Sequence, residues 1–524
     1  MMIEYLLTIP WLLYVFLRTK KALHMLQQNL YNDDNRYIKW MKNNFSKIML
    51  SYELLQLLLI PLIILLKLNI VIYISFGIIY LVLFIINRNI MKNEKVKKPL
   101  VVTARVKRIL TTVIIVYGLL IYFIHIRLNV NYLLLITILG YLQYIIALIA
   151  VKINVPVEKL VYLKFKTRAM NKLKSMPNLK VIGITGSYGK TSSKNILSEI
   201  LNVKYSALPT PKNLNTPYGL IMTINNNLDK FDEIFIAEMG AYKIGEIQTL
   251  CDLVHPKYGI LTRIGTAHLE LFGSQENIQK GKFELIESLP SDGVAVLNAD
   301  DPLQVNYNLK NKVKVLWIGI DNDADFKASN IKISNIGTTF DLEIKGDNKK
   351  YKFETRLLGY ANIYNILASI ALGYELKINM DQLIGAVKGV KPVEHRLELK
   401  KNGDIFYLDD AYNSNPVGSK MALDVLNTMP GKKIIVTPGM IELGPIQDEA
   451  NEKFGEYIAD VCDEVILVGK KQTEAIQKGL RNKKYDEKHL HILEDVIDAF
   501  PLINKLKDKV TYVLLENDLP DMFK

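Results

Sequence analysis

Five apolar runs occupy most of the first 151 residues of this chain and constrain its fold more than any other feature. Four of them have roughly the 20 residues that a helix needs to cross the hydrocarbon core of a bilayer. The first run is shorter, contains Pro10 and follows no basic segment or small-residue cleavage site, so we interpret it as a retained span or interfacial helix rather than a signal peptide. The sequence therefore predicts a helical transmembrane region over 1–156, with spans at roughly 3–17, 48–66, 69–87, 109–126 and 130–151.

Positive charge is concentrated in the same third of the chain. Residues 1–175 hold 24 Lys and Arg against 6 Asp and Glu, a net charge of +18, whereas the whole chain carries +13. These cations flank apolar runs instead of covering a polar domain, which favours membrane lipids as partners and argues against nucleic acid. They gather in segments 18–47 and 88–108, while the intervening turns carry only Lys67 and Arg127. Cytoplasmic loops are rich in Lys and Arg, so five spans are expected, with the N-terminus outside and the rest of the chain in the cytoplasm. Buried helices of a large soluble protein are the alternative.

A basic linker over residues 157–179 follows the last span. Its cations are interspersed with apolar residues such as Leu160 and Phe165. This composition fits a helix lying on anionic lipid headgroups. It fits a solvated linker helix almost as well, and the sequence leaves the two open.

From Lys180 the pattern changes to strands that alternate with helices, which is typical of a mostly parallel α/β sheet. A buried strand ending at Ile184 precedes the sequence T-G-S-Y-G-K-T, and a helix is expected from Ser192 to Leu201. A glycine-containing loop between a strand and a helix N-terminus cradles phosphates with its backbone N–H groups. The general phosphate-loop pattern has a glycine where this chain has Ile184, so the loop by itself is a moderate signal. The expected nucleotide contacts are Thr185, Gly186, Ser187, Tyr188, Gly189, Lys190, Thr191 and Ser192.

Several motifs in a fixed order make the chain from about 180 to about 470 resemble the Mur ligase family. The phosphate loop has that family's form, T-G-x-x-G-K-T. The chain is similar at K-N-L-N-T-P-Y-G (212–219), E-M-G-A (238–241), G-T-A-H-L-E (265–270), K-F-E (282–284), V-L-N-A-D-D-P (296–302), H-R-L-E (395–398) and D-D-A-Y-N-S-N-P (409–416). The segment M-I-E-L-G (440–444) is similar to a marker of the branch that adds D-alanyl-D-alanine.

The resemblance implies both a fold and an activity. It implies a P-loop, mostly parallel α/β ATPase-type domain over 180–390 and a mobile, Rossmann-like α/β domain over 391–524. It also implies an ATP-dependent ligase that activates a carboxylate as an acyl phosphate, releases ADP and phosphate, and joins the acyl group to an amine. ATP and Mg²⁺ are the implied cofactors.

The resemblance also gives roles to individual residues. Lys190, His268 and Lys282 are the expected catalytic residues. Thr191 and Glu238 would hold one Mg²⁺, and His268 together with a carbamylated Lys282 would hold a second, because a carbamate is an anionic oxygen ligand whereas an ammonium repels a metal. Lys280 competes with Lys282 for this role. Further nucleotide contacts are expected from Asn298, Arg396 and Asp410, and substrate contacts from Asn215, Thr216 and Asn413. Asn362 and Asn365 are expected either to line the nucleotide pocket or to cap a helix.

The chain departs from the family pattern on the substrate side. The family normally begins with a soluble domain that binds a uridine nucleotide, and the segment between the last span and the phosphate loop is too short for one. The branch usually ends its last strand with K-G-S-R, where this chain has Glu516 and Asp518, which argues against an anionic incoming group or favours a cationic one. Tyr242 and Lys243 stand where the branch commonly has Asn-His. The acceptor is therefore expected to carry a lipid rather than uridine diphosphate.

The sequence thus predicts a multi-pass protein of the cell membrane with cytoplasmic catalytic domains. It would add an amino acid or short peptide to a cell-wall precursor, which is either a small molecule or lipid-linked. The alternatives are D-alanyl-D-alanine addition to the uridine-diphosphate muramoyl tripeptide, a P-loop membrane transporter and an inactive scaffold. The transporter is disfavoured because no L-S-G-G-Q signature occurs.

Overall fold

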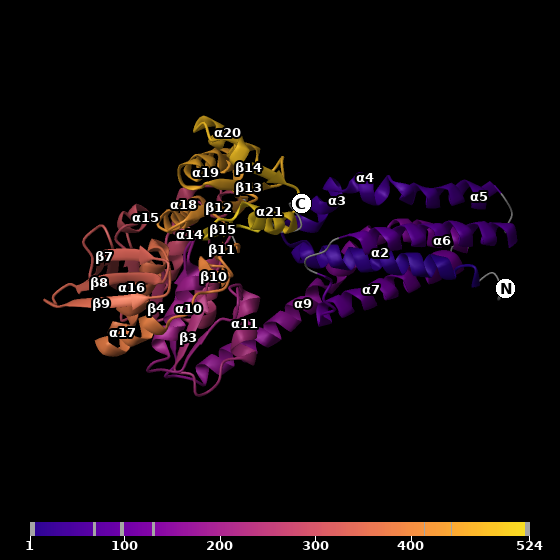
Figure 1. Ribbon diagram of the computed structural model, residues 1–524. Coiled ribbons are helices and arrows are strands. Elements are labelled where there is room, and N and C mark those ends of the chain that lie inside the picture. The colour runs from indigo at the N-terminus through magenta and orange to yellow at the C-terminus, as the bar shows by residue number, and fades with distance from the viewer. Residues whose placement is uncertain are drawn as a thin grey trace. The chain divides into compact units, whose positions relative to one another are not determined.

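The computed structural model describes residues 6–65, 70–94, 99–127, 131–412, 414–441 and 443–518 (Figure 1). The chain divides into two compact units, one comprising Met1–Lys164 with Pro520–Lys524 and the other Phe165–Leu519. We call them the helical unit and the α/β unit and describe each by itself. This division confirms the predicted fold class, a helical N-terminal region followed by mixed α/β structure with mostly parallel sheets.

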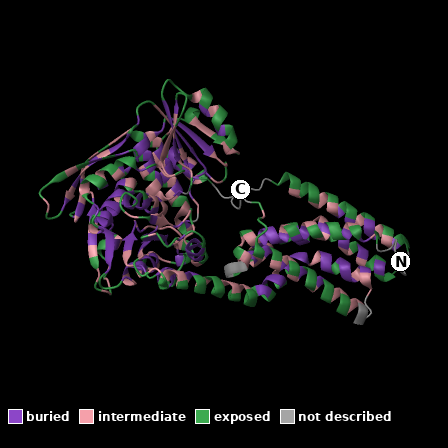
Figure 2. Cartoon of the chain, turned by 90° about the horizontal axis from the view of Figure 1, so that it is seen from below, coloured by how far each residue is buried: buried purple, intermediate pink, exposed green. Residues whose placement is uncertain are grey.

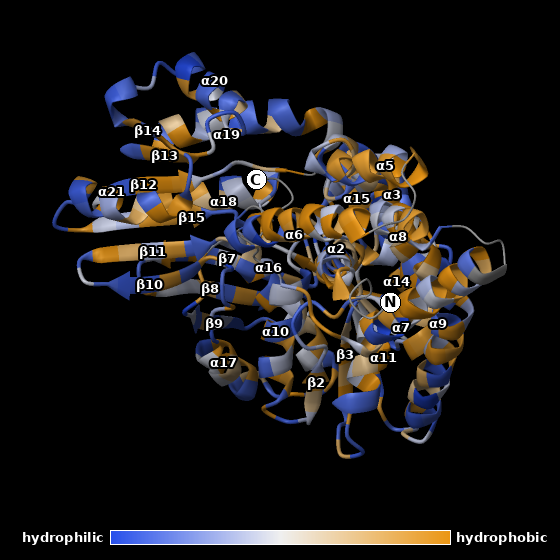
Figure 3. Cartoon of the chain, turned by 90° about the vertical axis from the view of Figure 1, so that its right-hand side faces the viewer, coloured by the Kyte–Doolittle hydropathy of each residue, from blue (hydrophilic) through white to orange (hydrophobic). Residues whose placement is uncertain are grey.

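The described residues of the helical unit are mostly helical, and its last helix continues into the α/β unit from Phe165. Its α-helices are α2 (Ile9–Gln28), α3 (Arg36–Asn43), α4 (Phe45–Met49), α5 (Leu59–Leu65), α6 (Ile70–Asn93), α7 (Ala104–Leu120), α8 (Tyr132–Tyr141) and α9 (Gln143–Lys174). Helices α6 and α7 keep large apolar side chains exposed, among them Ile78 and Leu119 (Figures 2 and 3). An apolar exterior of this kind suits a lipid environment.

Fewer helices than expected have the length and composition of a membrane span. Within the described part of the chain, α6 and the helical stretch Ala104–His125 meet both requirements. The pair α8 and α9 adds a third candidate if its 77° bend lies within one span. Residues 48–65 do not form one α-helix but are divided among α4, a 3₁₀ segment (Tyr52–Leu58) and α5. The span expected at 48–66 stays a prediction. The count of five spans stays a prediction.

A buried ion pair joins α2 to the 3₁₀ segment. The sequence predicts Arg18 at the start of a basic loop, but this residue lies within α2, where its guanidinium pairs with Glu53 in the 3₁₀ segment. Tyr14 donates a hydrogen bond to the same carboxylate, and Gln56 Nε2 donates to it at 3.1 Å. Buried charges are retained only where they are paired, so Glu53 and its partners hold α2 against the 3₁₀ segment.

The basic linker is helical, because α9 continues to Lys174. Near its end, the carbonyl of Phe165 accepts a hydrogen bond from Asn225 Nδ2, and Ala169 is fully buried. The last turns of α9 therefore belong to the core of the α/β unit.

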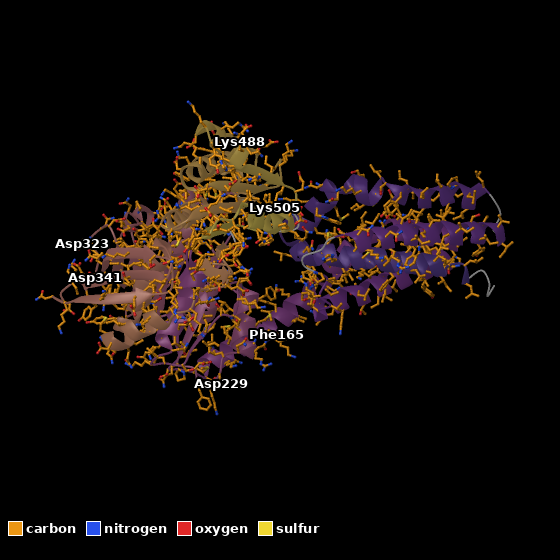
Figure 4. All side chains as sticks on the ribbon, viewed as in Figure 1. Phe165, Asp229, Asp323, Asp341, Lys488 and Lys505 are labelled. Atoms are coloured by element: carbon orange, nitrogen blue, oxygen red, sulfur yellow. The ribbon has the colours of Figure 1, made fainter. Side chains whose placement is uncertain are left out.

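The first sheet of the α/β unit has nine strands in the order β2-β3-β1-β4-β5-β6-β7-β8-β9. It is parallel as far as β7 and antiparallel beyond it, where Asp341 lies on β8 (Figure 4). Its strands are β1 (Lys180–Thr185), β2 (Ala207–Pro209), β3 (Ile234–Glu238), β4 (Tyr258–Leu261), β5 (Val294–Asn298), β6 (Lys314–Gly319), β7 (Phe326–Ser334), β8 (Gly337–Ile344) and β9 (Lys350–Thr355).

Alternation along β1 explains how both faces of this sheet are covered. Ile182 and Ile184 belong to one apolar cluster with residues of α10 (Lys190–Leu201) and α16 (Tyr360–Glu375). Gly183 points to the opposite face, where Leu285 of α14 (Gln275–Glu287) occupies the space that a side chain would need. Successive residues of a strand face opposite sides, so a strand with apolar residues at every position requires helices on both.

The second sheet has six strands in the order β10-β11-β15-β12-β13-β14. The strand β10 is antiparallel and the others are parallel. The strands are β10 (Glu398–Asn402), β11 (Ile405–Asp410), β12 (Lys432–Thr437), β13 (Glu464–Val468), β14 (Leu490–Leu493) and β15 (Thr511–Glu516). Helices α18 (Pro416–Asn427) and α19 (Gln447–Val461) share an apolar core with it. The remaining helices of the α/β unit are α11 (Pro217–Asn226), α12 (Glu246–Val254), α13 (Leu269–Phe272), α15 (Pro302–Val305), α17 (Met380–Gly389), α20 (Glu474–Asn482) and α21 (Ala499–Leu506).

Candidate active site

The phosphate loop joins the carboxyl end of β1 to the first turn of α10. Gly189 adopts φ 82° before the helix begins at Lys190. The backbone N–H of Ser187 donates to the carbonyl of Arg263 at 2.9 Å, which ties the loop to the chain after β4. Lys190 Nζ donates to the carbonyls of Gly186 and Ser187 at 2.8 and 3.2 Å, so its ammonium lies over the loop where phosphates would bind.

The loop requires glycine at position 186. Its φ is 149°, and a Cβ there would lie 1.9 Å from Thr262 Oγ1. The Thr262 hydroxyl donates to the carbonyl of Tyr188 and cannot withdraw without releasing the loop.

We expect Gly186→Ala to weaken the binding of a fluorescent ADP analogue by at least about tenfold, because the loop must move to admit the methyl group. Gly385→Ala is the matched control, since a Cβ at that helical glycine meets nothing within 4 Å. Equal affinity in the two variants would contradict the assignment of the loop.

Glu238 ends β3 opposite the first turn of α10. Thr191 Oγ1 lies 3.2 and 3.1 Å from its two carboxylate oxygens. Asn215 Nδ2 donates to it at 3.0 Å, and Lys194 Nζ lies 3.0 Å from Oε2. The sequence predicted Thr191 and Glu238 together but missed Lys194. The available signal was its helical spacing, since residues three and four apart share one face of a helix.

The oxygen atoms of Thr191 and Glu238 are suitable ligands for a hard cation. A hydroxyl and a carboxylate in contact are the oxygen ligands that Mg²⁺ prefers, with water and substrate phosphates completing its coordination. Among the described residues, no group of three or more His, Cys, Asp or Glu side chains could hold a metal by itself. The protein part of the site is therefore small. Thr216 accepts a hydrogen bond from Gly219 N and caps α11, and its predicted contact with substrate stays a prediction.

His268 lies in the chain after β4, immediately before α13. It has a φ of 60°, and its ring lies against Tyr242 with centroids 4.6 Å apart. Burial, reinforced by the charges of Lys190 and Lys282, lowers the pKa of His268 to about 4. The imidazole is therefore neutral at pH 7, as a metal ligand or hydrogen-bond partner must be.

Lys282 occupies a buried position on α14. Its Nζ donates to the carbonyl of Ala241 at 3.3 Å and lies over the ring of Phe272. Burial, reinforced by Lys190, holds the pKa of Lys282 well below its ordinary value. Lys280 on the same helix is exposed. The structure thus separates the two candidate lysines, placing Lys282 inside and Lys280 on the surface.

A nucleotide-sized space adjoins the phosphate loop. One small cavity is lined by Asn298, Asn365 and Gly189, and an adjoining cavity of about 690 Å³ extends between the loop after β4 and helices α18 and α19. Arg263, which the sequence analysis missed, lines both cavities. From the sequence, Asn362 and Asn365 are each expected either to line the nucleotide pocket or to cap a helix. Asn365 lines the small cavity, whereas Asn362 Nδ2 donates to a backbone carbonyl.

Arg396 and Asp410 lie together on the C-terminal sheet's side of the site. The guanidinium of Arg396 stacks over the ring of Tyr412 at 4.1 Å, and Leu397 N donates to Asp410 Oδ1 at 3.1 Å. Burial raises the pKa of Asp410 to about 6, although the charge of Arg396 opposes this shift. The other predicted contact from this segment, Asn413, lies outside the described residues.

Glu516 ends β15 but does not face solvent. Its Oε1 accepts hydrogen bonds from the hydroxyls of Ser414 and Ser419, both at 2.8 Å. Burial, reinforced by the neighbouring Asp410, raises the pKa of Glu516 well above its ordinary range. A buried carboxyl group held by two serine hydroxyls argues against the direct contact with an incoming group that the sequence suggested. Asp518 is exposed.

Comparisons with known proteins agree with this arrangement. Residues 184–373 match the model of the Mur ligase middle domain, and residues 395–515 match that of the Mur ligase, glutamate ligase domain. The UDP-N-acetylmuramoyl-tripeptide–D-alanyl-D-alanine ligase of Bacillus subtilis is 32% identical over 61% of this chain and 69% of its own length. The enzyme of that name from Escherichia coli is 34% identical over 57% and 66%. The chain thus spans about two thirds of the length of these relatives.

A solved structure shows the same likeness. The crystal structure of MurF ligase from Thermotoga maritima in complex with ADP is 27% identical, covers 68% of this chain and 80% of its own, and has a TM-score of 0.62.

Proposed function

The chain belongs to the Mur ligase family, and we propose that it is a membrane-anchored member acting at the cytoplasmic face of the cell membrane. Members of this family form amide bonds with the use of ATP and Mg²⁺. The proposed ligase chemistry rests on the clustering of Lys190, Glu238, His268 and Lys282 at one edge of the first sheet. Three of them follow the carboxyl ends of β1, β3 and β4, where ligands of parallel sheets bind. The proposed membrane anchor rests on the apolar helices of the helical unit.

The proposed reaction has two steps. A carboxylate oxygen of the acceptor bonds to the γ-phosphorus of ATP, and the bond to ADP breaks. The amine nitrogen of an amino acid or short peptide then bonds to the acyl carbon, inorganic phosphate leaves and a proton is released. Lys190 would offset the negative charge of the phosphates in the first step, because its ammonium already lies over the loop that would hold them.

Thr191 and Glu238 would hold Mg²⁺ beside the phosphates. When bound, the metal neutralises charge as two anions approach each other. On the nucleotide, Asn298, Asn365 and Arg263 line the cavities described above, and Arg396 and Asp410 would contact the ribose and phosphates from the C-terminal sheet.

Lys282 is proposed to carry a carbamate. Burial lowers the pKa of Lys282 and so favours its unprotonated amine, which is the form that adds CO₂. The addition forms an N–C bond, releases a proton and replaces a cation with an anion. A carbamate on Lys282 and the neutral imidazole of His268 would then supply two ligands to a second metal.

We propose two candidate acceptor substrates. A lipid-linked cell-wall precursor is favoured by the apolar helices of the helical unit, which precede the segments matched by the family models. The relatives' names favour the second, in which D-alanyl-D-alanine is added to UDP-N-acetylmuramoyl-tripeptide.

We expect the full chain, purified in detergent, to release ADP in proportion to a new amide product when given ATP, mixed amino acids and dipeptides, and a lipid extract. The parallel reaction contains the UDP-linked tripeptide with D-alanyl-D-alanine, and mass spectrometry identifies each product. Turnover with the lipid fraction alone supports the first acceptor, whereas turnover with the soluble precursor alone overturns it.

A further inference from the structure

A second lysine of α10, Lys194, has no part in the reaction proposed above. It lies one turn beyond Lys190, and its side chain is 1% exposed. Its ammonium lies 3.0 Å from Glu238 Oε2 and also donates to the carbonyl of Lys212. Burying an ammonium is costly, so a buried lysine on a proposed metal ligand requires an explanation.

The contacts of Glu238 show what this lysine does. Thr191 and Asn215 supply neutral donors to the carboxylate, whereas Lys194 supplies the one cation in contact with it among the residues that the structure describes. The Glu238 carboxylate, on a side chain that is 2% exposed, is therefore neutralised before any metal arrives. A free divalent cation would have to draw Glu238 away from this ammonium with Lys190 close by, which Coulomb repulsion disfavours.

We propose that Lys194 is a positioning residue that keeps Glu238 paired and so makes entry of Mg²⁺ conditional on bound nucleotide. The phosphates of ATP bring the negative charge that the unliganded site lacks. Only with them bound does the attraction of Mg²⁺ to the site exceed the free energy needed to displace Lys194 from Glu238. The bond from Lys194 to Lys212 extends this control to the segment carrying Asn215. The inference rests on the proposed role of Glu238 as a metal ligand.

Binding of Mn²⁺ tests the inference without reference to turnover. Electron paramagnetic resonance measures free Mn²⁺ in the presence of the full chain in detergent, with and without a non-hydrolysable ATP analogue, and the Mn²⁺ bound by the analogue in a protein-free sample is subtracted. For the unaltered protein we expect Mn²⁺ to bind at least tenfold more tightly with the analogue. In Lys194→Met, nucleotide-free affinity should rise at least tenfold, because the carboxylate loses its resident cation.

Two further variants serve as controls. Lys194→Arg keeps the charge and should keep the dependence on nucleotide. Lys314→Met removes an exposed lysine that pairs with Glu375 at 2.8 Å, and it should behave as the unaltered protein.

The outcomes separate the inference from the proposed function. No binding of Mn²⁺ even with the analogue would overturn the metal site itself. Equal affinity with and without the analogue in the unaltered protein would overturn only the role of Lys194. Because this comparison uses the unaltered protein, it tests the role of Lys194 even if Lys194→Met does not fold. A folded Lys194→Met that still requires nucleotide would overturn the role as well.

Discussion

Lys190→Met is expected to lower the rate of ADP formation by about 10²–10³-fold, the loss typical of removing one preorganised donor from developing charge. The ammonium lies over the phosphate loop through its bonds to Gly186 and Ser187. Methionine fills similar space but offers the phosphates no charge. Release of ADP, followed with a coupled assay at saturating ATP, measures the effect.

The same substitution should raise the thermal stability of the nucleotide-free protein near pH 7. Burial lowers the pKa of Lys190 to about 8 in the folded state, below its ordinary value of 10.5. The folded protein therefore binds the proton more weakly than the unfolded chain. The resulting destabilisation is fully present below about pH 8 and is relieved as pH rises from there towards 10.5. Methionine removes it at all pH values.

Lys257→Met, at an exposed lysine paired with Asp292, is the control and should change neither activity nor this pH dependence. A Lys190→Met enzyme that retains its activity would show that Lys190 does not act on the phosphates. A Lys190→Met protein that unfolds at a lower temperature than the unaltered protein near pH 7 would show that the buried ammonium of Lys190 does not destabilise the fold.

Lys282→Ala is expected to reduce activity by at least about a hundredfold, because it removes the proposed carbamate ligand. Adding a small carboxylate such as acetate should restore part of the activity, since the cavity left by the side chain can admit a substitute anionic oxygen. Lys280→Ala is the matched control, being two residues away on the same helix and exposed. Activity in the presence and absence of acetate is compared for the three proteins.

Labelling with ¹³C-bicarbonate tests the modification directly. The unaltered protein should show a carbamate carbon signal in its ¹³C spectrum, and Lys282→Ala should lack it. Persistence of the signal in Lys282→Ala would place the carbamate elsewhere. Its absence from an active unaltered enzyme would show that Lys282 carries no carbamate.

Motifs that combine a strand end with a polar residue were predictable from the sequence. The phosphate loop, Glu238 and His268 each follow an apolar strand, and parallel strands bring their carboxyl ends to one edge of a sheet. The position of Lys282 depended on resemblance, because its spacing from Lys280 does not reveal which of the two faces inwards. Apolar runs after residue 391 also predict four strands, at 405–408, 433–437, 464–468 and 510–515. The structure has them at 405–410, 432–437, 464–468 and 511–516, so no end is displaced by more than two residues.

Features that depend on contacts between distant segments were missed. In the sequence, Lys194 is indistinguishable from an exposed helical lysine, and only the fold places it beside Glu238 at the end of β3. The sequence pattern predicts Arg18 as a loop cation, but the fold pairs it with Glu53. It predicts Glu516 as a surface acid, but Ser414 and Ser419 bind its carboxyl group inside the domain. In each case a charged residue is buried because a partner far away in sequence compensates it, and hydropathy assigns such residues to the surface.

The fate of the carboxylate oxygen tests the central claim most directly. With ¹⁸O in the acceptor's carboxylate, formation of an acyl phosphate predicts that one labelled oxygen passes to inorganic phosphate for each amide bond formed. Mass spectrometry of the phosphate released by the full chain detects it. Unlabelled phosphate formed alongside the amide product would contradict the account, because the phosphoryl group would then have passed to water instead of the acid.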